Sequence, residues 1–275
     1  MTPAAVMVYV DFDADMETRV GLAAGIAARF KATLIGVAGW PLRNHDALRL
    51  SEIEFPATDE ASTDRVIERL EYLGKKFRQT AGAGPKSVEW RSSMHFPREF
   101  LVEQARAADL IVIGSDALPG DIYRTYDPGT VVLGSGRPVL ITLPGNHRPD
   151  FPNILIAWKN TREACRAVHD SLPFLAAAKS VHIVAARAGD EKAVQSEMAD
   201  VAEYLKRHGI SAARPEIAHA DGRNEGEVLL AVAREQQADL IVAGAYGRTR
   251  LREWVFGGVT RTLLQSSPVP CLLSN

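Results

Sequence analysis

The chain has 275 residues, 46% of them apolar, which is enough for one large domain or two ordinary domains with buried cores. Its formal net charge of −2 excludes a global basic field that would recruit nucleic acid or an anionic membrane. No apolar run approaches the ~20 residues that a membrane span needs, and the N-terminus lacks the pattern of a signal peptide. We therefore expect a cytoplasmic protein that binds neither nucleic acid nor membrane.

Four segments of the first half return in the same order in the second half. The clearest pair reads ADLIVIG at 108–114 and ADLIVAG at 238–244. The other pairs are 6–10 with 154–158, 31–37 with 179–184, and 137–141 with 269–273. Unrelated segments of similar composition are the alternative, but an ordered set of four matches favours a tandem repeat.

The predicted elements alternate between strands and helices along the chain. The repeated segments are short continuous apolar runs, typical of parallel strands that are buried on both faces. Residues 65–79 and 194–208 carry apolar side chains at helical spacing, and Gly209 follows the second helix as a C-cap would. For the long connection over 40–62 we expect a surface loop with a short helix. The sequence thus predicts an α/β fold with right-handed crossovers between parallel strands.

The boundary between the halves is polar and rich in proline. Residues 144–152 contain three prolines and one glycine, which is typical of a linker. We predict two domains, at 1–144 and 152–275. Each is expected to form its own sheet of five parallel strands, with a pseudo-twofold axis between the halves and no continuous sheet across them.

One loop of the second half combines glycines with positive charge. In open α/β sheets, ligands bind outside the carboxyl ends of the strands. After the strand at 240–243 come two glycine clusters and then a helix over 259–265 and a last strand over 270–273. Glycines let backbone approach a ligand, and free amides at a helix N-terminus bind phosphate. The loop also carries Arg248, Arg250, Arg252 and Arg261, so it predicts an anion site, although a structural turn with solvated arginines is the alternative.

This loop resembles that of the universal stress proteins. The family pattern is Gly, two residues, Gly, nine residues, Gly and then Ser or Thr, and in members that bind ATP it holds the phosphates and ribose. Gly244, Gly247 and Gly257 have this spacing, whereas Gly258 stands in the place of the hydroxyl residue. The resemblance covers nearly the whole chain, because each half resembles one family domain. It implies two tandem doubly wound, Rossmann-like units, similar to adenine nucleotide alpha hydrolases.

The resemblance also implies a function and a set of binding residues. We expect an adenine nucleotide, foremost ATP with or without Mg²⁺, to bind in the second half as a regulatory ligand. The expected nucleotide-binding residues are Gly244, Gly247, Arg248, Gly257, Gly258, Val259 and Thr260. The alternatives are an interaction or dimerisation module without nucleotide and, less favoured, a slow ATPase. No catalytic or metal-binding residue is expected, because Glu253 is the only acid in the loop and no metal-ligand motif is present.

The first half lacks the glycine loop. It keeps Asp11, which matches the adenine-side aspartate of family members that bind ATP, whereas the second half has Lys159 there. Asp127 is expected to cap a helix over 129–134, and Pro128 removes an amide that a phosphate would need. We therefore expect no nucleotide in the first half.

The resemblance further implies that the halves form an internal pseudo-dimer through their last strands, at 138–143 and 269–273. The sequence does not decide whether two whole chains form a homodimer, and it identifies no protein partner. The two cysteines cannot form a disulfide framework. We expect Cys165 on a helix and Cys271 on a core strand, both as small buried side chains.

Overall fold

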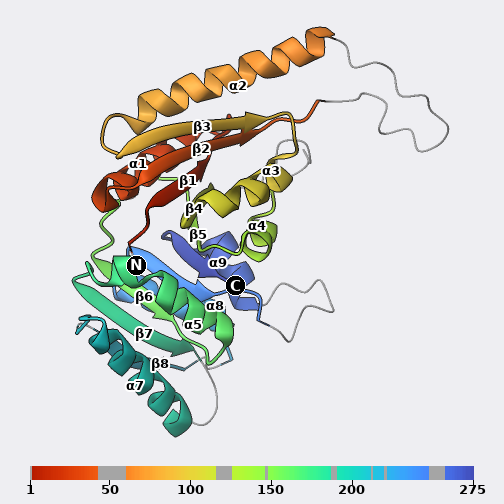
Figure 1. Cartoon of the computed structure of the whole chain (residues 1–275). Helices are drawn as coiled ribbons and strands as arrows, with labels where there is room; N and C mark the ends of the chain where they lie inside the picture. Colours follow the sequence, from red (N-terminus) through yellow and green to blue (C-terminus); the bar gives the residue numbers. More distant parts are fainter. Residues whose placement is uncertain are drawn as a thin grey trace, which may run out of the picture.

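The protein is a three-layer α/β structure around one large sheet (Figure 1). The computed structural model describes residues 2–42, 60–115, 126–145, 148–186, 191–211, 213–219, 222–247 and 258–275. Within these residues the ten-stranded sheet has the order β3-β2-β1-β4-β5-β10-β9-β6-β7-β8. The first half of the chain supplies the first five strands of this order, and the second half supplies the other five.

The first half alternates strand and helix, and its neighbouring strands are all parallel. Its strands are β1 (Ala5–Tyr9), β2 (Thr33–Gly39), β3 (Ser87–Ser93), β4 (Leu110–Gly114) and β5 (Val139–Thr142). Its helices are α1 (Met16–Phe30), α2 (Glu60–Ala81), α3 (Pro97–Gln104), which runs on into the 3₁₀ turn η1 (Ala105–Ala107), and α4 (Pro128–Ser135).

The second half repeats this order, and its neighbouring strands are parallel as well. Its strands are β6 (Asn153–Ala157), β7 (Ser180–Ala186), β8 (Ala213–Ala218), β9 (Leu240–Gly244) and β10 (Cys271–Ser274). Its helices are α5 (Arg162–Asp170), the short α6 (Leu172–Leu175), α7 (Glu191–Arg207), α8 (Glu225–Glu235) and α9 (Gly258–Ser266). Two tandem doubly wound units of five parallel strands, as the sequence predicted, therefore make up the fold.

The two sheets are joined at their last strands. β5 and β10 pair antiparallel, with Leu140 opposite Leu272, so the expected pairing of the last strands is confirmed. The expectation of two separate sheets is wrong for the same reason, because hydrogen bonds between β5 and β10 merge them into one. Read outward from this central pair, the strand order is the same in both halves, as a pseudo-twofold axis between the halves would produce.

Alternating side chains of the strands divide the core into two layers. On β1, Val6 and Val8 pack with helices α1 and α2, whereas Met7 and Tyr9 pack with α3 and α4. The layer of α1 and α2 continues into α5 and α7 of the second half, and the layer of α3 and α4 continues into α8 and α9. Each layer therefore spans both halves, and all these strand residues are buried.

The core elements predicted from the sequence are present. The two edge strands of the sheet, β3 and β8, were not located from the sequence. The helices expected at 65–79 and 194–208 belong to α2 and α7, and Gly209 has the left-handed φ of +77° that suits a C-cap glycine. The structure adds β3 and β8, which are half exposed and carry polar residues. Most of the connection predicted over 40–62 lies outside the described residues.

The two cysteines differ in burial. Cys271 on β10 is buried, and this burial raises the pKa of its thiol to about 12. Cys165 lies on a helix as expected, but its predicted burial is wrong because it sits on the outer face of α5. A cysteine on the outer face of an amphipathic helix meets solvent whatever its hydrophobicity.

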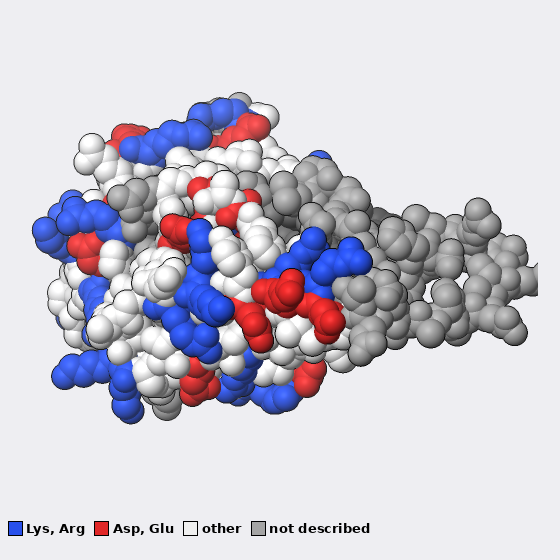
Figure 2. All heavy atoms as spheres, turned by 90° about the horizontal axis from the view of Figure 1, so that it is seen from above, with Lys and Arg blue, Asp and Glu red and all other residues white. Residues whose placement is uncertain are grey.

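Charge is mixed on the face of the molecule that Figure 2 shows. In Figure 2, which looks onto the α2 end of the molecule, Lys and Arg are interspersed with Asp and Glu. None of the described helices combines the length and apolar character that a helix needs to cross a membrane.

Candidate functional site

The strand order points to a candidate site in the second half at the carboxyl ends of β6 and β9. These two strands are neighbours, and the chain turns to opposite sides of the sheet after them, which is the usual binding position in such sheets. The segment 158–161 follows β6, and the segment 245–247 follows β9. Helix α9 begins at Gly258 on the way to β10. These three segments carry the described residues of the predicted site.

Gly244 is required by packing. A Cβ at this position would overlap the backbone of α5, lying 2.6 Å from the carbonyl carbon of Glu163 and 2.8 Å from Cα of Ala164. Real Cβ atoms do not approach backbone so closely, so the first turn of α5 explains the glycine without any ligand. The sequence interpretation that Gly244 serves ligand approach therefore gains no support from the structure.

Gly247 has no such packing reason. Among the described residues, a Cβ there would meet only the Glu163 carboxylate, with Oε2 3.4 Å away, which is an ordinary contact. The φ of Gly247 also lies outside the left-handed range that demands glycine. The missing side chain thus leaves this backbone open beside α5, as a loop that contacts a ligand requires.

The loop between these glycines is held by the chain terminus and by the first half. Asn275 Nδ2 donates to the carbonyl oxygens of Ala245 at 2.8 Å and Tyr246 at 3.2 Å. Tyr246 has a left-handed φ of +58°, an uncommon conformation for a residue with a large side chain. Its hydroxyl lies where a Cβ on Gly129 would be, at the start of α4. Burial, and then the charge of Asp127, raise the pKa of Tyr246.

The start of α9 supplies the other described part of the site. Gly258 is exposed, and of the residues that the structure describes a Cβ on it would meet only the Asn224 side chain, with Nδ2 3.6 Å away. The first turn of α9 contains no acidic residue. Val259 is half exposed, whereas Thr260 is buried and faces the core. The predicted residues Arg248 and Gly257 lie outside the described part of the chain, as do Arg250, Arg252 and Glu253.

The structure also describes two cations named in the sequence, Lys159 and Arg261. Lys159 is exposed at the end of β6. Its carbonyl accepts from the Thr161 amide at 2.6 Å, and its side chain makes no hydrogen bond or ion pair with a described residue. Arg261 donates from Nε to Gln265 Oε1 at 3.2 Å, so its side chain lies along α9. The structure therefore brings Gly244, Gly247, Gly258 and Val259 to one end of the sheet, and it turns Thr260 inward.

Buried polar atoms without hydrogen-bond partners occur at this same end of the sheet. Within the described residues, Trp158 Nε1 and Glu163 Oε1 are fully buried and make no hydrogen bond. Trp158 directly follows β6, and Glu163 lies in the first turn of α5 after the Thr161 cap. A buried polar atom without a partner is costly, and such atoms often mark places where a ligand binds.

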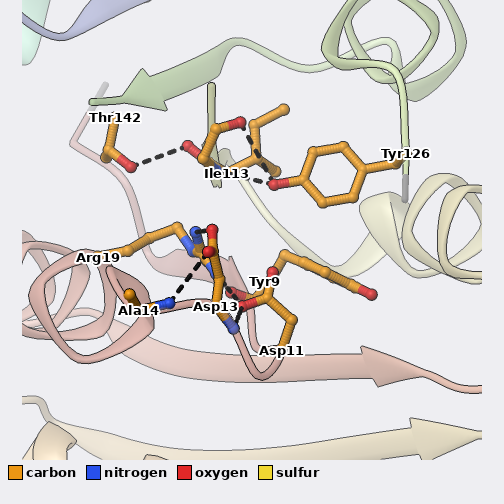
Figure 3. A network of polar contacts seen from close by, with 9 residues as sticks. Tyr9, Asp11, Asp13, Ala14, Arg19, Ile113, Tyr126 and Thr142 are labelled. Atoms are coloured by element: carbon orange, nitrogen blue, oxygen red, sulfur yellow. Dashed lines mark hydrogen bonds and ion pairs between the residues drawn. The ribbon is translucent and has the colours of Figure 1, made fainter. Parts of the chain in front are cut away.

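The equivalent end of the first half is filled by its own side chains (Figure 3). Arg19 of α1 is buried and lies next to β1 and β4. Its Nε donates to the Tyr9 carbonyl at 3.1 Å, and its Nη2 donates to Asp11 Oδ1 at 2.6 Å. Asp13 Oδ2 lies 3.9 Å from Nη1. Asp11, the expected adenine-side residue, is therefore engaged in a buried ion pair.

Arg19 and Tyr126 also close the end of β4. A Cβ on Gly114 would lie 2.5 Å from Arg19 Nη1, and the Tyr126 hydroxyl accepts from the Gly114 amide at 2.9 Å. Burial raises the pKa values of Tyr9 and Tyr126, so both hydroxyls stay neutral. Burial also raises the pKa of Asp11, and the positive charge of Arg19 opposes that rise.

The predicted helix cap in the first half is confirmed. Asp127 accepts from the amides of Gly129 at 3.2 Å and Thr130 at 3.1 Å, and Pro128 occupies the first position of α4. A carboxylate therefore satisfies the amides that would otherwise face a phosphate.

Comparison with known proteins identifies the second half. Residues 151–274 match the family described as "Usp: Universal stress protein family". The second half of the chain belongs to the universal stress protein family. No curated protein matches the sequence.

Solved structures show that the tandem fold is shared with universal stress proteins. A universal stress protein from Archaeoglobus fulgidus DSM 4304 is 17% identical with a TM-score of 0.68, covering 98% of this chain and 96% of that one. A putative universal stress protein from Pseudomonas aeruginosa UCBPP-PA14 is 17% identical with a TM-score of 0.56, covering 98% and 92%. A universal stress protein in complex with cAMP is 22% identical with a TM-score of 0.38, covering 53% and 100%. At 17% identity the first two of these likenesses show the fold alone.

Sequence reasoning missed Glu163, Arg19 and Tyr126. Glu163 has the pattern of an ordinary first-turn acid, which favours the helix dipole, and its burial by β9 cannot be read locally. For Arg19 a signal was present, because it lies at helical spacing among the apolar residues of α1 and eight residues after Asp11. A charged residue in an apolar stripe predicts a buried partner.

A surface hollow of ≈ 600 Å³ lies away from this chemistry. It runs between α2 and β3 at the outer edge of the first half, with Leu70, Trp90 and Met94 among its lining residues. Both candidate ends of the sheet lie elsewhere, at β6–β9 and β1–β4. The hollow thus gives no support to a nucleotide site.

Proposed function

We propose that the second half binds an adenine nucleotide, ATP foremost, as a regulatory ligand. The proposal is supported by the family match over 151–274 and by the family spacing of Gly244, Gly247 and Gly257. Phosphates would lie between the 245–247 segment and the start of α9, where backbone amides and the positive helix end face an anion.

The observation that carries the proposal is the contrast between the glycines of this loop. Gly244 is explained by packing against α5, whereas no described residue gives Gly247 a steric reason to lack a side chain. Glycine costs conformational entropy on folding, so glycines without a packing or φ requirement favour a role in ligand approach. Gly247 is such a glycine, and it lies on a segment that the family pattern assigns to phosphate.

Calorimetric titration of the full chain with ATP, ADP and AMP tests this proposal. Gly247→Val should weaken ATP binding by about 1–3 kcal/mol, because the branched side chain blocks the backbone and leaves polar groups unpaired. Gly258→Ser restores the family hydroxyl in open space and should strengthen binding by roughly 1.5 kcal/mol, the effect of one hydrogen bond to a charged group.

Gly21→Val is the matched control. Gly21 lies on α1, and a Cβ there would meet nothing within 4 Å, so this variant should bind ATP as the wild type does. Equal binding by the wild type and Gly247→Val would exclude this loop as the site. A wild type that binds no nucleotide at millimolar concentration would favour the interaction module of the same fold.

The first half is proposed to hold no nucleotide. Asp127 caps α4, Pro128 removes an amide, and Arg19 occupies the space beside Gly114. The Arg19 guanidinium and the Tyr126 hydroxyl satisfy the groups that a ligand would otherwise contact there. The first half then serves as a structural partner: its strand β5 pairs with β10, and its helix α4 packs against Tyr246 of the binding half.

A further inference from the structure

Glu163 places a buried carboxylate inside the proposed nucleotide site. The residue is 3% exposed and lies in the first turn of α5, directly after the Thr161 cap and Arg162. Its Oε2 would lie 3.4 Å from a Cβ on Gly247, and its backbone contacts Gly244. Both ends of the 244–247 loop therefore lie against this one residue.

The contacts of Glu163 satisfy its charge only in part. Oε1 is fully buried and makes no hydrogen bond with the described residues. Arg162 Nη2 lies 3.2 Å from Oε1, within ion-pair distance but without hydrogen-bond geometry, and the Arg162 side chain is 60% exposed. An exposed guanidinium is screened by water, so it compensates a buried carboxylate weakly.

This carboxylate conflicts with a bare phosphate in the same loop. Like charges a few ångströms apart repel strongly in a partly dehydrated site. A divalent cation between the two groups removes the conflict, because Mg²⁺ is held in proteins by one or two carboxylates together with the phosphates of a nucleotide. The described residues contain no cluster of three His, Cys, Asp or Glu that would hold a metal ion without the ligand.

We propose that Glu163 is a ligand for a divalent cation of the Mg²⁺ class, which enters with the nucleotide. The site then takes the metal–nucleotide complex and rejects the free nucleotide. This inference rests on the proposed function of the same loop. In it, Glu163 supplies one carboxylate oxygen, the phosphates supply the remaining anionic ligands, and the cation neutralises charge that burial would otherwise make costly.

The test compares ATP binding with excess Mg²⁺ and with EDTA, by calorimetry on the full chain. We expect the wild type to bind at least about tenfold more weakly in EDTA, because the repulsion is then uncompensated. Glu163→Gln keeps the shape and removes the charge, so its affinity should differ by less than about threefold between the two buffers. Glu203→Gln is the control: it removes the same charge from an exposed site on α7, and it should behave as the wild type.

Each outcome decides the matter. Equal wild-type affinity in both buffers overturns the cation proposal and leaves the nucleotide site standing. The same Mg²⁺ requirement in Glu163→Gln also overturns it, since the requirement then comes from ATP alone. Weak binding by Glu163→Gln in both buffers assigns the carboxylate to a nucleotide hydroxyl and overturns it as well. No binding by either protein in either buffer rejects the proposed function and the cation ligand together.

Glu163→Asp keeps the experiment decisive should the glutamine variant fail to fold. It retains the negative charge and shortens the side chain by one methylene. We expect weaker binding that still requires Mg²⁺. An Asp variant that binds equally with and without Mg²⁺ would contradict the proposal.

Discussion

At the scale of single residues, the two halves use the carboxyl ends of their strands differently. In the second half Glu163 and Trp158 carry buried polar atoms without hydrogen-bond partners within the described residues. In the first half Arg19 bonds to Asp11 and to the Tyr9 carbonyl, and the Tyr126 hydroxyl bonds to the Gly114 backbone. A buried ion pair stabilises little by itself, but loss of one partner leaves an uncompensated charge. In the first half, the Arg19 side chain thus fills the space beside Gly114, and the polar groups there are already hydrogen-bonded.

Replacing Arg19 should reveal this closure as a stability effect. Arg19→Met removes the buried guanidinium and leaves Asp11 unpaired, which should lower the free energy of unfolding by about 3 kcal/mol. The double variant with Asp11→Asn should recover part of that loss, because the orphaned charge is gone. Urea denaturation followed by circular dichroism measures both.

Lys76→Met is the control for this cycle, because it breaks an ion pair with Glu17 on the exposed surface. Its effect on stability should be slight, since water screens that pair. If Arg19→Met unfolds at the same urea concentration as the control, the buried pair does not hold the site closed.

At the scale of elements, strong repeats were predictable and weakly patterned edges were not. Strands such as β4 and β9 are continuous apolar runs, so their sequence alone indicates burial on both faces. β3 and β8 lie at the two edges of the sheet, where polar residues are tolerated, and their pattern resembles that of loops. The glycine loop could be located from its spacing, whereas its contacts with α5 and α4 depend on tertiary packing.

Tyr246 connects the proposed nucleotide loop to the first half. Its hydroxyl occupies the space of a Cβ on Gly129, so Gly129→Ala should force the side chain away and lower the free energy of unfolding by about 1–3 kcal/mol. Tyr246→Phe removes the clashing oxygen, and the double variant should therefore lose less than the sum of the single changes. Thermal unfolding of the four proteins measures this coupling. Additive effects would show that the loop and α4 do not depend on each other.

At the scale of the whole molecule, the halves form one structure with unequal sites. The antiparallel β5–β10 pair and both core layers run across the boundary between the halves. Arg29 of the first half donates to the carbonyl oxygens of Pro149 at 3.1 Å and Asp150 at 2.8 Å, which fixes the connecting segment against α1. The sequence predicted this pairing of last strands through resemblance, but the separate sheets it also predicted are incompatible with hydrogen bonds between them. Domain boundaries at 144 and 152 stay a prediction.

The stoichiometry of ATP binding tests the central claim most directly. Titration of the full chain in Mg²⁺ should give one nucleotide per chain, because the first-half site is filled by Arg19 and capped by Asp127. The signal should be lost or strongly weakened in Gly247→Val and kept in Arg19→Met, which changes only the first half. Two nucleotides per chain, or one that survives in Gly247→Val, would contradict the assignment of the site to the second half.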